Sequence, residues 1–337
     1  MKFLKIVLYN FFVFLFFVIL LEAIFGYWFK KENFGIYMRK ERKVNWQTNV
    51  KFNMKDYSFF YKRNFWGFRG SEFEPKNVKI VFEGGSTGNQ RMTPEDLTIV
   101  GQLNKKLKSG DREIVIYNAS TDGKSVAGYV NDFLYWFPKI PNFEPEYFIF
   151  YIGVNDRVID EGQKYWDYKV SIKNIDKIKD YVKNNSFIAD RYKNIKNKFF
   201  PKITSGYYID YKDLYTNFDY VNYEDAKKIH STKSNKKILL IKEFNSRLIK
   251  LKMSIKKYDV KPIFITQIMY DGLRDQNIFL INNELKKFAK KNNYPLIFLD
   301  EIIEMDINDF FDKVHTTPKG SKKIAEAIYP YIIQYIN

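Results

Sequence analysis

The chain has 337 residues and an apolar fraction of 45%, which is enough for a large domain with a substantial core, so disorder is not the default interpretation. It contains no cysteine, so disulfides, thiolate metal sites and a cysteine nucleophile are excluded. The formal charge of +17 would suit a polyanionic partner, but the lysines are spread along the chain and form no single patch, so we expect no specific nucleic-acid binding.

The first 29 residues predict a membrane anchor. Residues 6–29 form an apolar run in which Asn10 and Glu22 are the only strongly polar members. A helix needs about 20 apolar residues to cross a bilayer, whereas the apolar region of a cleavable signal peptide is shorter, about 7–15 residues. We therefore expect an uncleaved signal anchor over residues 1–29 that crosses a bacterial inner membrane once.

The charges that flank this run leave its orientation open. Lys2 and Lys5 precede it, and six basic residues follow it: Lys30, Lys31, Arg39, Lys40, Arg42 and Lys43. The positive-inside rule would place the body of the chain in the cytoplasm, but large domains are translocated largely regardless of flanking charge. Because lysine is frequent throughout this chain, we expect an extracytoplasmic body.

After a polar, aromatic-rich lead-in at 30–76, five short apolar runs alternate with amphipathic stretches. The runs lie at 78–82, 114–117, 147–152, 262–266 and 295–299. Such near-continuous apolar strands are typical of a parallel sheet, which is buried on both faces. The amphipathic stretches predict helices at 95–108, 125–136, 238–257, 277–291 and 319–336. This alternation predicts an α/β fold over residues 77–337, a three-layer α/β/α sandwich with a central, mainly parallel five-stranded sheet of flavodoxin-like type.

One interval of this domain departs from the alternation. Residues 157–236 are rich in Lys, Asn, Tyr and Asp and contain no strongly apolar strand. About 80 residues is far longer than an ordinary loop, so we interpret the interval as an insertion or cap. Pro201, Gly206 and a group of tyrosines indicate a folded lobe, which we expect near the carboxyl ends of the strands, where open α/β sheets bind ligands.

Ser86 is the candidate nucleophile. It follows the first predicted strand within the sequence Gly-Gly-Ser-Thr-Gly at 84–88, where a tight turn into a helix would expose its hydroxyl and present backbone amides to an oxyanion. The same letters match the G-x-S-x-G elbow of α/β-hydrolases, although that elbow usually follows several strands. A phosphate-binding loop would need a lysine beside the serine, and none is present. Glycine–serine turns are also common without catalysis.

Three further loops carry residues that suit the same chemistry. Asp312 and His315 stand in one turn before the last predicted helix, where His315 could act as a base and Asp312 could orient it. Asn155 follows the third apolar run and could donate its amide to an oxyanion, and Gly123 could offer a backbone N–H. Each has a plainer interpretation, either a surface histidine beside a helix cap or turn-forming residues after strands.

Together these pieces resemble the sequence blocks of the SGNH (GDSL) hydrolase superfamily. Ser86 matches the block I serine, Gly123 the block II glycine and Asn155 the asparagine of block III. Asp312 and His315 match the Asp-x-x-His of block V. The resemblance implies a catalytic triad of Ser86, His315 and Asp312. It also implies an oxyanion hole made by the amides of Ser86 and Gly123 and the side chain of Asn155.

The resemblance covers residues from about 77 to the C-terminus, without the insertion. Gly85 stands where many members have aspartate, and Gly128 is a second candidate for the block II glycine. The Gly-Gly-Ser-Thr form resembles a bacterial, membrane-anchored subgroup with an upstream Asn…Gly-Phe-Arg-Gly segment, found here at 64–70. Such members are often linked to acyl groups on surface glycans.

The resemblance therefore implies a serine-dependent ester hydrolase that acts on O-acyl or O-acetyl groups of a carbohydrate through an acyl-enzyme. An O-acyltransferase that modifies a cell-surface glycan is the alternative, and a non-catalytic glycan-binding or assembly protein is a third hypothesis. No group of His, Asp and Glu has metal-ligand spacing, so we expect no metal and no cofactor. We expect His230 to be solvated. Thr266 and Gln267 either line the site or simply end a strand.

Overall fold

The computed structural model describes residues 2–26, 28, 41–46, 57–109, 114–158, 219–230 and 235–336, and short pieces between 178 and 195 (178–179, 182, 185–189, 191–192 and 195). The chain forms two compact units, Met1–Met38 with Lys169–Thr204 and Arg39–Tyr168 with Ser205–Asn337. Most of the predicted insertion at 157–236 lies outside the described residues. The domain boundaries expected near 29 and 76 stay predictions.

The first unit contains helix α1, Lys2–Phe25. Among the described residues, it is the one helix long and apolar enough to cross a membrane, with a mean hydropathy of 2.5. None of its residues is buried. The predicted anchor is therefore a single helix of adequate length. The membrane it would cross and the side on which the body lies stay predictions.

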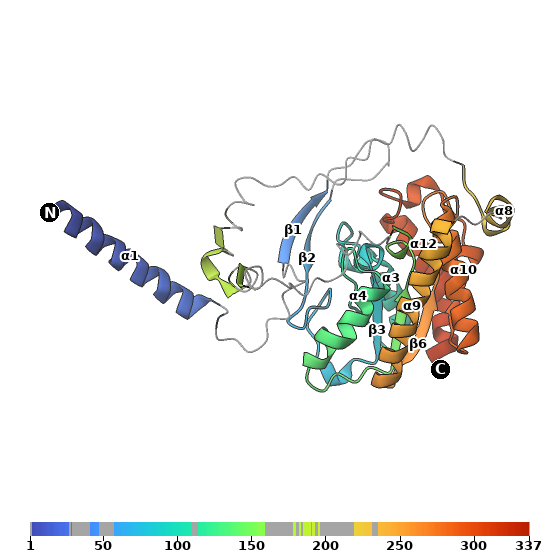
Figure 1. Cartoon of the computed structure of the whole chain (residues 1–337), viewed down its shortest axis with the longest axis horizontal. Helices are drawn as coiled ribbons and strands as arrows, with labels where there is room; N and C mark the ends of the chain where they lie inside the picture. The colour runs from blue at the N-terminus through green and yellow to red at the C-terminus, as the bar shows by residue number, and fades with distance from the viewer. Residues whose placement is uncertain are drawn as a thin grey trace. The chain divides into compact units, whose positions relative to one another are not determined.

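The second unit is an α/β domain with a central sheet of five parallel strands (Figure 1). The strands are β3 (Ile80–Gly84), β4 (Ile116–Asn118), β5 (Tyr147–Tyr151), β6 (Lys261–Ile265) and β7 (Leu296–Ile297). Their order is β4-β3-β5-β6-β7. The first strand of this sheet, β3, therefore lies between the second and the third, β4 and β5, as in flavodoxin-like folds. The predicted fold class is confirmed.

Five of the helices described in this unit pack in two groups. α3 (Ile99–Ser109) contacts α12 (Pro318–Ile336), and α9 (Asn235–Tyr258) contacts α4 (Val126–Asn131) and α10 (Gln276–Lys291). Figure 1 shows α4 and α9 side by side along the sheet. The other helices described in this unit are α2 (Ser86–Asn89), α8 (Tyr223–Ile229) and α11 (Leu299–Ile302). Turns of 3-10 helix lie at Pro75–Asn77, Glu95–Leu97, Phe137–Lys139, Asp156–Val158 and Ile307–Asp309.

The helix predicted at 125–136 differs from the expectation. It is α-helical to Asn131 and then continues as a π-helical turn, Asp132–Trp136. The carbonyl of Phe133 in this wider turn accepts a hydrogen bond from the Tyr258 hydroxyl of α9 at 2.7 Å. Asp132 and Trp136 are both buried. Contacts with the rest of the domain thus override the regular helical pattern.

The predicted lead-in contributes to this domain. Strands β1 (Glu41–Trp46) and β2 (Tyr57–Lys62) pair antiparallel. Beyond them Phe68 is fully buried, and its ring lies 5.0 to 5.7 Å from the rings of Phe73, Trp136 and Phe143. Arg69 bridges to Asn118 at the end of β4. The Gly-Phe-Arg-Gly segment is therefore packed against the sheet.

The last described part of the insertion also packs on the domain. The amide of Val221 donates to the Asp271 carbonyl at 3.1 Å, and the amide of Leu273 donates to the Val221 carbonyl at 2.8 Å. His230 ends α8, lies 2.9 Å through Nε2 from the Leu273 carbonyl and contacts the ring of Phe279. The expectation of a solvated His230 is wrong, because α8 packs against the loop after β6 and against α10.

Candidate active site

Ser86 lies at the carboxyl end of β3, where the chain turns from the sheet into α2. The carbonyl of Gly85 accepts hydrogen bonds from the amides of Gly88 at 3.1 Å and Asn89 at 2.9 Å, which closes the turn. Ser86 itself is partly exposed. Because the first amides of a helix have no intrahelical acceptor, the turn presents the Ser86 N–H beside the Ser86 hydroxyl. A nucleophile that stabilises its own oxyanion needs this arrangement.

Asn155 follows the neighbouring strand. Gly84 pairs with Tyr151 at the ends of β3 and β5, the two strands between which the strand order reverses. Ligands of open α/β sheets bind outside the carboxyl ends of the strands at such a switch point. Ser86 and Asn155 are therefore positioned at the expected place for a substrate.

The side chain of Asn155 lies directly against the turn between Gly85 and Ser86. Its Nδ2 donates to the Lys124 carbonyl at 2.8 Å. A Cβ at Gly85 would lie only 2.1 Å from this Nδ2 and 2.9 Å from the same carbonyl. Asn155 therefore occupies the space that a side chain at position 85 would need, which explains glycine where the resembling superfamily often has aspartate. The structure thus brings together the turn before Ser86, the segment after Gly123 and Asn155.

Asp312 and His315 form the expected pair. Asp312 Oδ2 lies 2.5 Å from His315 Nδ1, and Asp312 Oδ1 accepts from the amides of Val314 at 2.8 Å and His315 at 2.7 Å. Burial opposes ionisation of Asp312, but the hydrogen bond and the charge of His315, together with these amides, lower its pKa below the ordinary value. An ionised Asp312 fixes Nδ1 as the donor and leaves Nε2 as the acceptor that a general base needs.

Gln90 connects the loop of Asp312 and His315 with the turn at Ser86. It ends α2 with φ 46°, and its Nε2 donates to Thr316 Oγ1 at 2.9 Å and Ser321 Oγ at 2.6 Å. Its Oε1 accepts from the amide of Ile99 at 2.7 Å. Gln90 is buried. The residue after His315 is therefore bonded to a side chain only four positions after Ser86.

Gln267 makes a second connection, at the end of β6. Its Nε2 donates to Thr87 Oγ1 and to the Tyr151 carbonyl, each at 3.0 Å, and its Oε1 accepts from the Val154 amide at 2.6 Å. Gln267 is buried, and its hydrogen bonds hold the residue after Ser86 and the residue before Asn155. Gln267 thus follows the end of a strand and also contacts residues next to Ser86 and Asn155.

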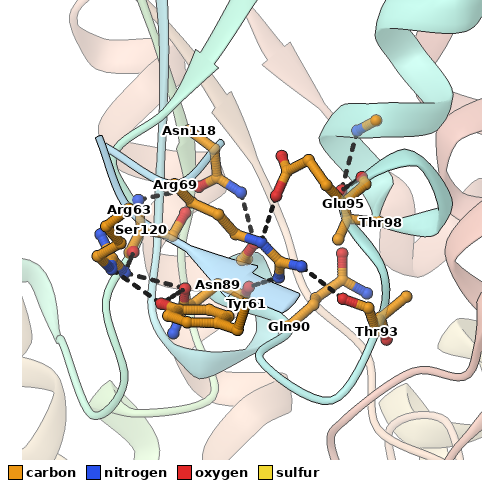
Figure 2. Close-up of polar contacts among 12 residues, drawn as sticks. Tyr61, Arg63, Arg69, Asn89, Gln90, Thr93, Glu95, Thr98, Asn118 and Ser120 are labelled. Carbon is orange, nitrogen blue, oxygen red and sulfur yellow. Dashed lines mark hydrogen bonds and ion pairs between the residues drawn. The ribbon is translucent and has the colours of Figure 1, made fainter. Parts of the chain in front are cut away.

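Two buried arginines from the lead-in support α2 from the other side (Figure 2). Arg63 donates to Asn89 Oδ1 at 2.9 Å, to the Tyr61 hydroxyl at 2.8 Å and to the Ser120 carbonyl. The Tyr61 hydroxyl also donates to Asn89 Oδ1, at 2.8 Å. Asn89 Nδ2 in turn donates to Asp122 at 2.7 Å. Arg63 therefore connects the end of α2 with the loop that carries Gly123.

Arg69 contacts the chain just after α2. It donates to the backbone carbonyls of Asn89 and Thr93, and it pairs with Glu95 at 2.5 Å (Figure 2). Its backbone amide donates to the Asn118 carbonyl at 2.8 Å. These contacts fix residues 89–95 to the end of β4. Sequence reasoning treated this arginine only as part of a subgroup motif and gave it no structural role.

A buried charge cluster forms around Lys124, which follows Gly123 in the sequence. Lys124 Nζ donates to Glu83 Oε2 at 3.0 Å and to Asp132, and all three side chains are 5% exposed or less. Burial and the nearby Asp132 raise the pKa of Glu83 well above its ordinary value, although Lys124 opposes this. Burial would lower the pKa of Lys124, but its two carboxylate neighbours raise it. The ammonium group of Lys124 is thus held by Glu83 and Asp132, while its backbone carbonyl accepts the hydrogen bond from Asn155.

The predicted site residues therefore occupy one end of the sheet, in four loops connected by buried side chains. Gly123 has φ 77° in the turn before α4, whereas the alternative Gly128 lies inside α4. Within the part of the chain that the structure describes, no three His, Asp or Glu side chains lie together as metal ligands would. The arrangement suits covalent acyl chemistry by a serine.

Comparison with known proteins finds solved structures of distant likeness. No family model and no curated protein matches the chain. Similar solved structures include the psychrotrophic esterase EstA from Pseudoalteromonas sp., 11% identical over 77% of this chain and 100% of that chain, with a TM-score of 0.43. The acetyl xylan esterase Axe2 from Geobacillus stearothermophilus is 13% identical over 76% of this chain and 94% of that chain, with a TM-score of 0.43.

A member of the lipolytic protein G-D-S-L family from Veillonella parvula is 12% identical over 75% of this chain and 97% of that chain, with a TM-score of 0.41. The name of this last neighbour is that of the family whose sequence blocks the chain resembles. A likeness this distant assigns no activity to this chain.

Proposed function

We propose that this chain is a serine-dependent ester hydrolase of the SGNH type, with Ser86 as nucleophile, His315 as general base and Asp312 as the group that orients it. The observation that carries the proposal is the Asp312–His315 pair at 2.5 Å, in a loop that Gln90 bonds to the turn of Ser86. A serine needs such an oriented imidazole to become a nucleophile.

In the proposed reaction His315 Nε2 takes the proton of Ser86 as Ser86 Oγ attacks the ester carbonyl carbon. The ionised Asp312 stabilises the imidazolium that forms. The tetrahedral intermediate collapses when the alcohol leaves with the proton from His315, which gives an acyl-enzyme. Water then attacks the acyl group with His315 again as base, releases the acid and restores Ser86.

The oxyanion would accept hydrogen bonds from the amides of Ser86 and Gly123 and from Asn155. One N–H of the Asn155 amide is bonded to the Lys124 carbonyl, and an amide group carries two, so the other is left for substrate. The bond to Lys124 fixes the orientation of this donor before substrate arrives. Donors arranged in advance lower the barrier because they need no reorganisation during the reaction.

We further propose that the substrate is an O-acylated, above all O-acetylated, carbohydrate at a membrane to which α1 anchors the enzyme, with the body on the extracytoplasmic side. An O-acyltransferase would use the same acyl-enzyme and replace water with a sugar hydroxyl. Release of free acetate without an acceptor supports hydrolysis, whereas turnover only with an added sugar acceptor would support transfer.

The test uses the full chain in detergent with p-nitrophenyl acetate and a fluorophosphonate probe. The parent should turn over the ester and be labelled, and Ser86→Ala should do neither at unchanged melting temperature. Ser71→Ala, at an exposed serine, is the control and should behave like the parent. An unlabelled, inactive parent would contradict the triad and favour a non-catalytic binding protein.

A further inference from the structure

Glu22 is the one acidic residue of α1 and lies in its last turn. Its carboxylate accepts hydrogen bonds from Trp28 Nε1 at 2.7 Å, Ser186 Oγ at 2.6 Å and the backbone amides of Phe187 at 2.9 Å and Ile188 at 3.0 Å. An acidic residue is costly in an apolar membrane helix unless it has partners. Here three of the four donors come from a segment more than 160 residues further along the chain.

These donors belong to the start of a helical stretch. Phe187, Ile188 and Ala189 are helical, and Ser186 Oγ accepts from the Ala189 amide at 3.0 Å, as an N-cap residue does. The free amides and the positive end of a helix favour a carboxylate. The ring of Phe187 lies 5.2 Å from that of Phe25, the last residue of α1. The stretch therefore starts at the C-terminal end of the candidate membrane span.

One face of this stretch is apolar and exposed. Ile188, Tyr192 and Ile195 have the spacing i, i+4, i+7 and are 37%, 66% and 56% exposed. Ile178 and Val182, also helical, have the spacing i, i+4 and are 62% and 45% exposed. A row of large apolar side chains in water indicates an interaction surface.

The charges of the segment identify the partner. Between 178 and 198 the sequence has six basic residues, Lys179, Lys183, Arg191, Lys193, Lys196 and Lys198, against Asp180 and Asp190. A second copy of so basic a segment would be repelled, whereas anionic lipid headgroups would be attracted. Amphipathic helical segments with apolar and basic faces bind at the boundary between headgroups and acyl chains.

We propose that the residues described between 178 and 195 belong to a membrane-surface segment, which lies on an anionic bilayer beside the exit of α1 and is positioned there by Glu22. The inference rests on the proposed membrane anchoring. It implies that part of the insertion is held at the bilayer surface, next to the point where the chain leaves it.

The absence of cysteine makes the test direct, because each introduced cysteine is unique. The full chain is placed in nanodiscs of phosphatidylcholine and phosphatidylglycerol, with a nitroxide at Leu15→Cys, Tyr192→Cys, Ile195→Cys or the exposed Lys256→Cys. Collision with oxygen, which concentrates in lipid, is compared with collision with a water-soluble nickel complex. Leu15 should be in the acyl region, Lys256 in water, and Tyr192 and Ile195 at an intermediate depth that becomes shallower without phosphatidylglycerol.

A matched pair of variants tests the role of Glu22. Glu22→Leu should move the Tyr192 label into water, whereas Asn10→Leu, at the other polar position of the span, should leave its depth unchanged. Aqueous Tyr192 and Ile195 with Leu15 in lipid would overturn the inference and leave the anchor intact. Leu15 in water would overturn the anchor itself, and spin–spin broadening at Tyr192 would show that a second copy covers the face instead.

Discussion

The side-chain amide of Gln90 donates to the hydroxyl of Thr316 at 2.9 Å, and this bond joins the two halves of the proposed triad. Ser86 begins the short helix that Gln90 ends, and His315 immediately precedes Thr316. Both halves lie on loops that are far apart in the sequence. Their relative position therefore depends on a buried side chain that takes no part in the chemistry.

Gln90→Met should preserve the side-chain length and remove all of its hydrogen bonds. We expect kcat to fall by up to about 100-fold at similar KM, because a shift of about 1 Å between reacting groups is that costly. The free energy of unfolding should fall by about 1–3 kcal/mol, since buried partners lose a hydrogen bond. Steady-state kinetics and urea unfolding give both values. Gln102→Met, at a half-buried position of α3, is the control, and an equal fall in kcat there would refute this role of Gln90.

A second prediction concerns Gly85. Gly85→Ala would bring a methyl group to 2.1 Å from Asn155 Nδ2, so the Asn155 side chain must move and its hydrogen bond to Lys124 must break. We expect a loss of kcat of about 10²–10³-fold, the usual effect of losing one oxyanion donor.

The double variant Gly85→Ala/Asn155→Ala separates packing from catalysis. Removing the Asn155 amide relieves the closer clash and leaves the 2.9 Å contact with the Lys124 carbonyl, so the melting temperature should rise above that of Gly85→Ala while activity stays low. Activity that recovers together with stability would mean that Asn155 is not an oxyanion donor.

The sequence predicted the five strands because they are nearly continuous apolar runs, and it predicted Ser86, Asn155, Asp312 and His315 because each follows such a run or precedes a helix. It did not reveal Gln90 or the cluster of Lys124, and it left open whether Gln267 contacts the site, because their roles come from partners distant in the sequence. The signal for Arg63 and Arg69 was present, two arginines within an aromatic segment, but several of their partners are backbone carbonyls, which leave no trace in the sequence.

Arg69 offers a third prediction. Arg69→Met removes the donor to the carbonyls of Asn89 and Thr93, at a cost of about 1–3 kcal/mol for each buried carbonyl left unpaired. Because these carbonyls lie just after α2, kcat should fall with stability even where the variant is fully folded. Arg91→Met breaks a half-exposed pair with Asp122 and should cost about 0–1 kcal/mol. Chemical unfolding combined with kinetics at 10 °C compares the two, and equal effects would refute the special role of Arg69.

The last prediction uses the raised pKa of Glu83. A carboxyl group whose pKa is higher in the folded than in the unfolded state costs nothing below its ordinary value of 4.5, where both states are protonated. As the pH rises above 4.5 toward the folded pKa, the unfolded state has lost its proton while the folded state keeps it, so the free energy of unfolding falls until the folded state also ionises. Glu83→Gln keeps the shape of the neutral acid and cannot ionise, so its stability should show less of this fall between about pH 5 and pH 9.

Asp132→Asn is the matched control for Glu83→Gln, because it changes the other carboxyl group that contacts Lys124. It removes a partner whose charge raises the pKa of both Glu83 and Lys124, and it leaves the buried ammonium with Glu83 as its one carboxyl partner in the cluster. Glu83 should therefore ionise more readily, and the variant should lose about 3–5 kcal/mol because a buried ion pair is broken from one side. Thermal melting of the parent and both variants across this pH range tests the assignment. A parent whose stability does not fall with pH, or a Glu83→Gln variant as unstable as Asp132→Asn, would mean that Glu83 is ionised in the folded protein. Lys124 would then hold two carboxylates, and the position of the carbonyl that orients Asn155 would depend on both of them equally.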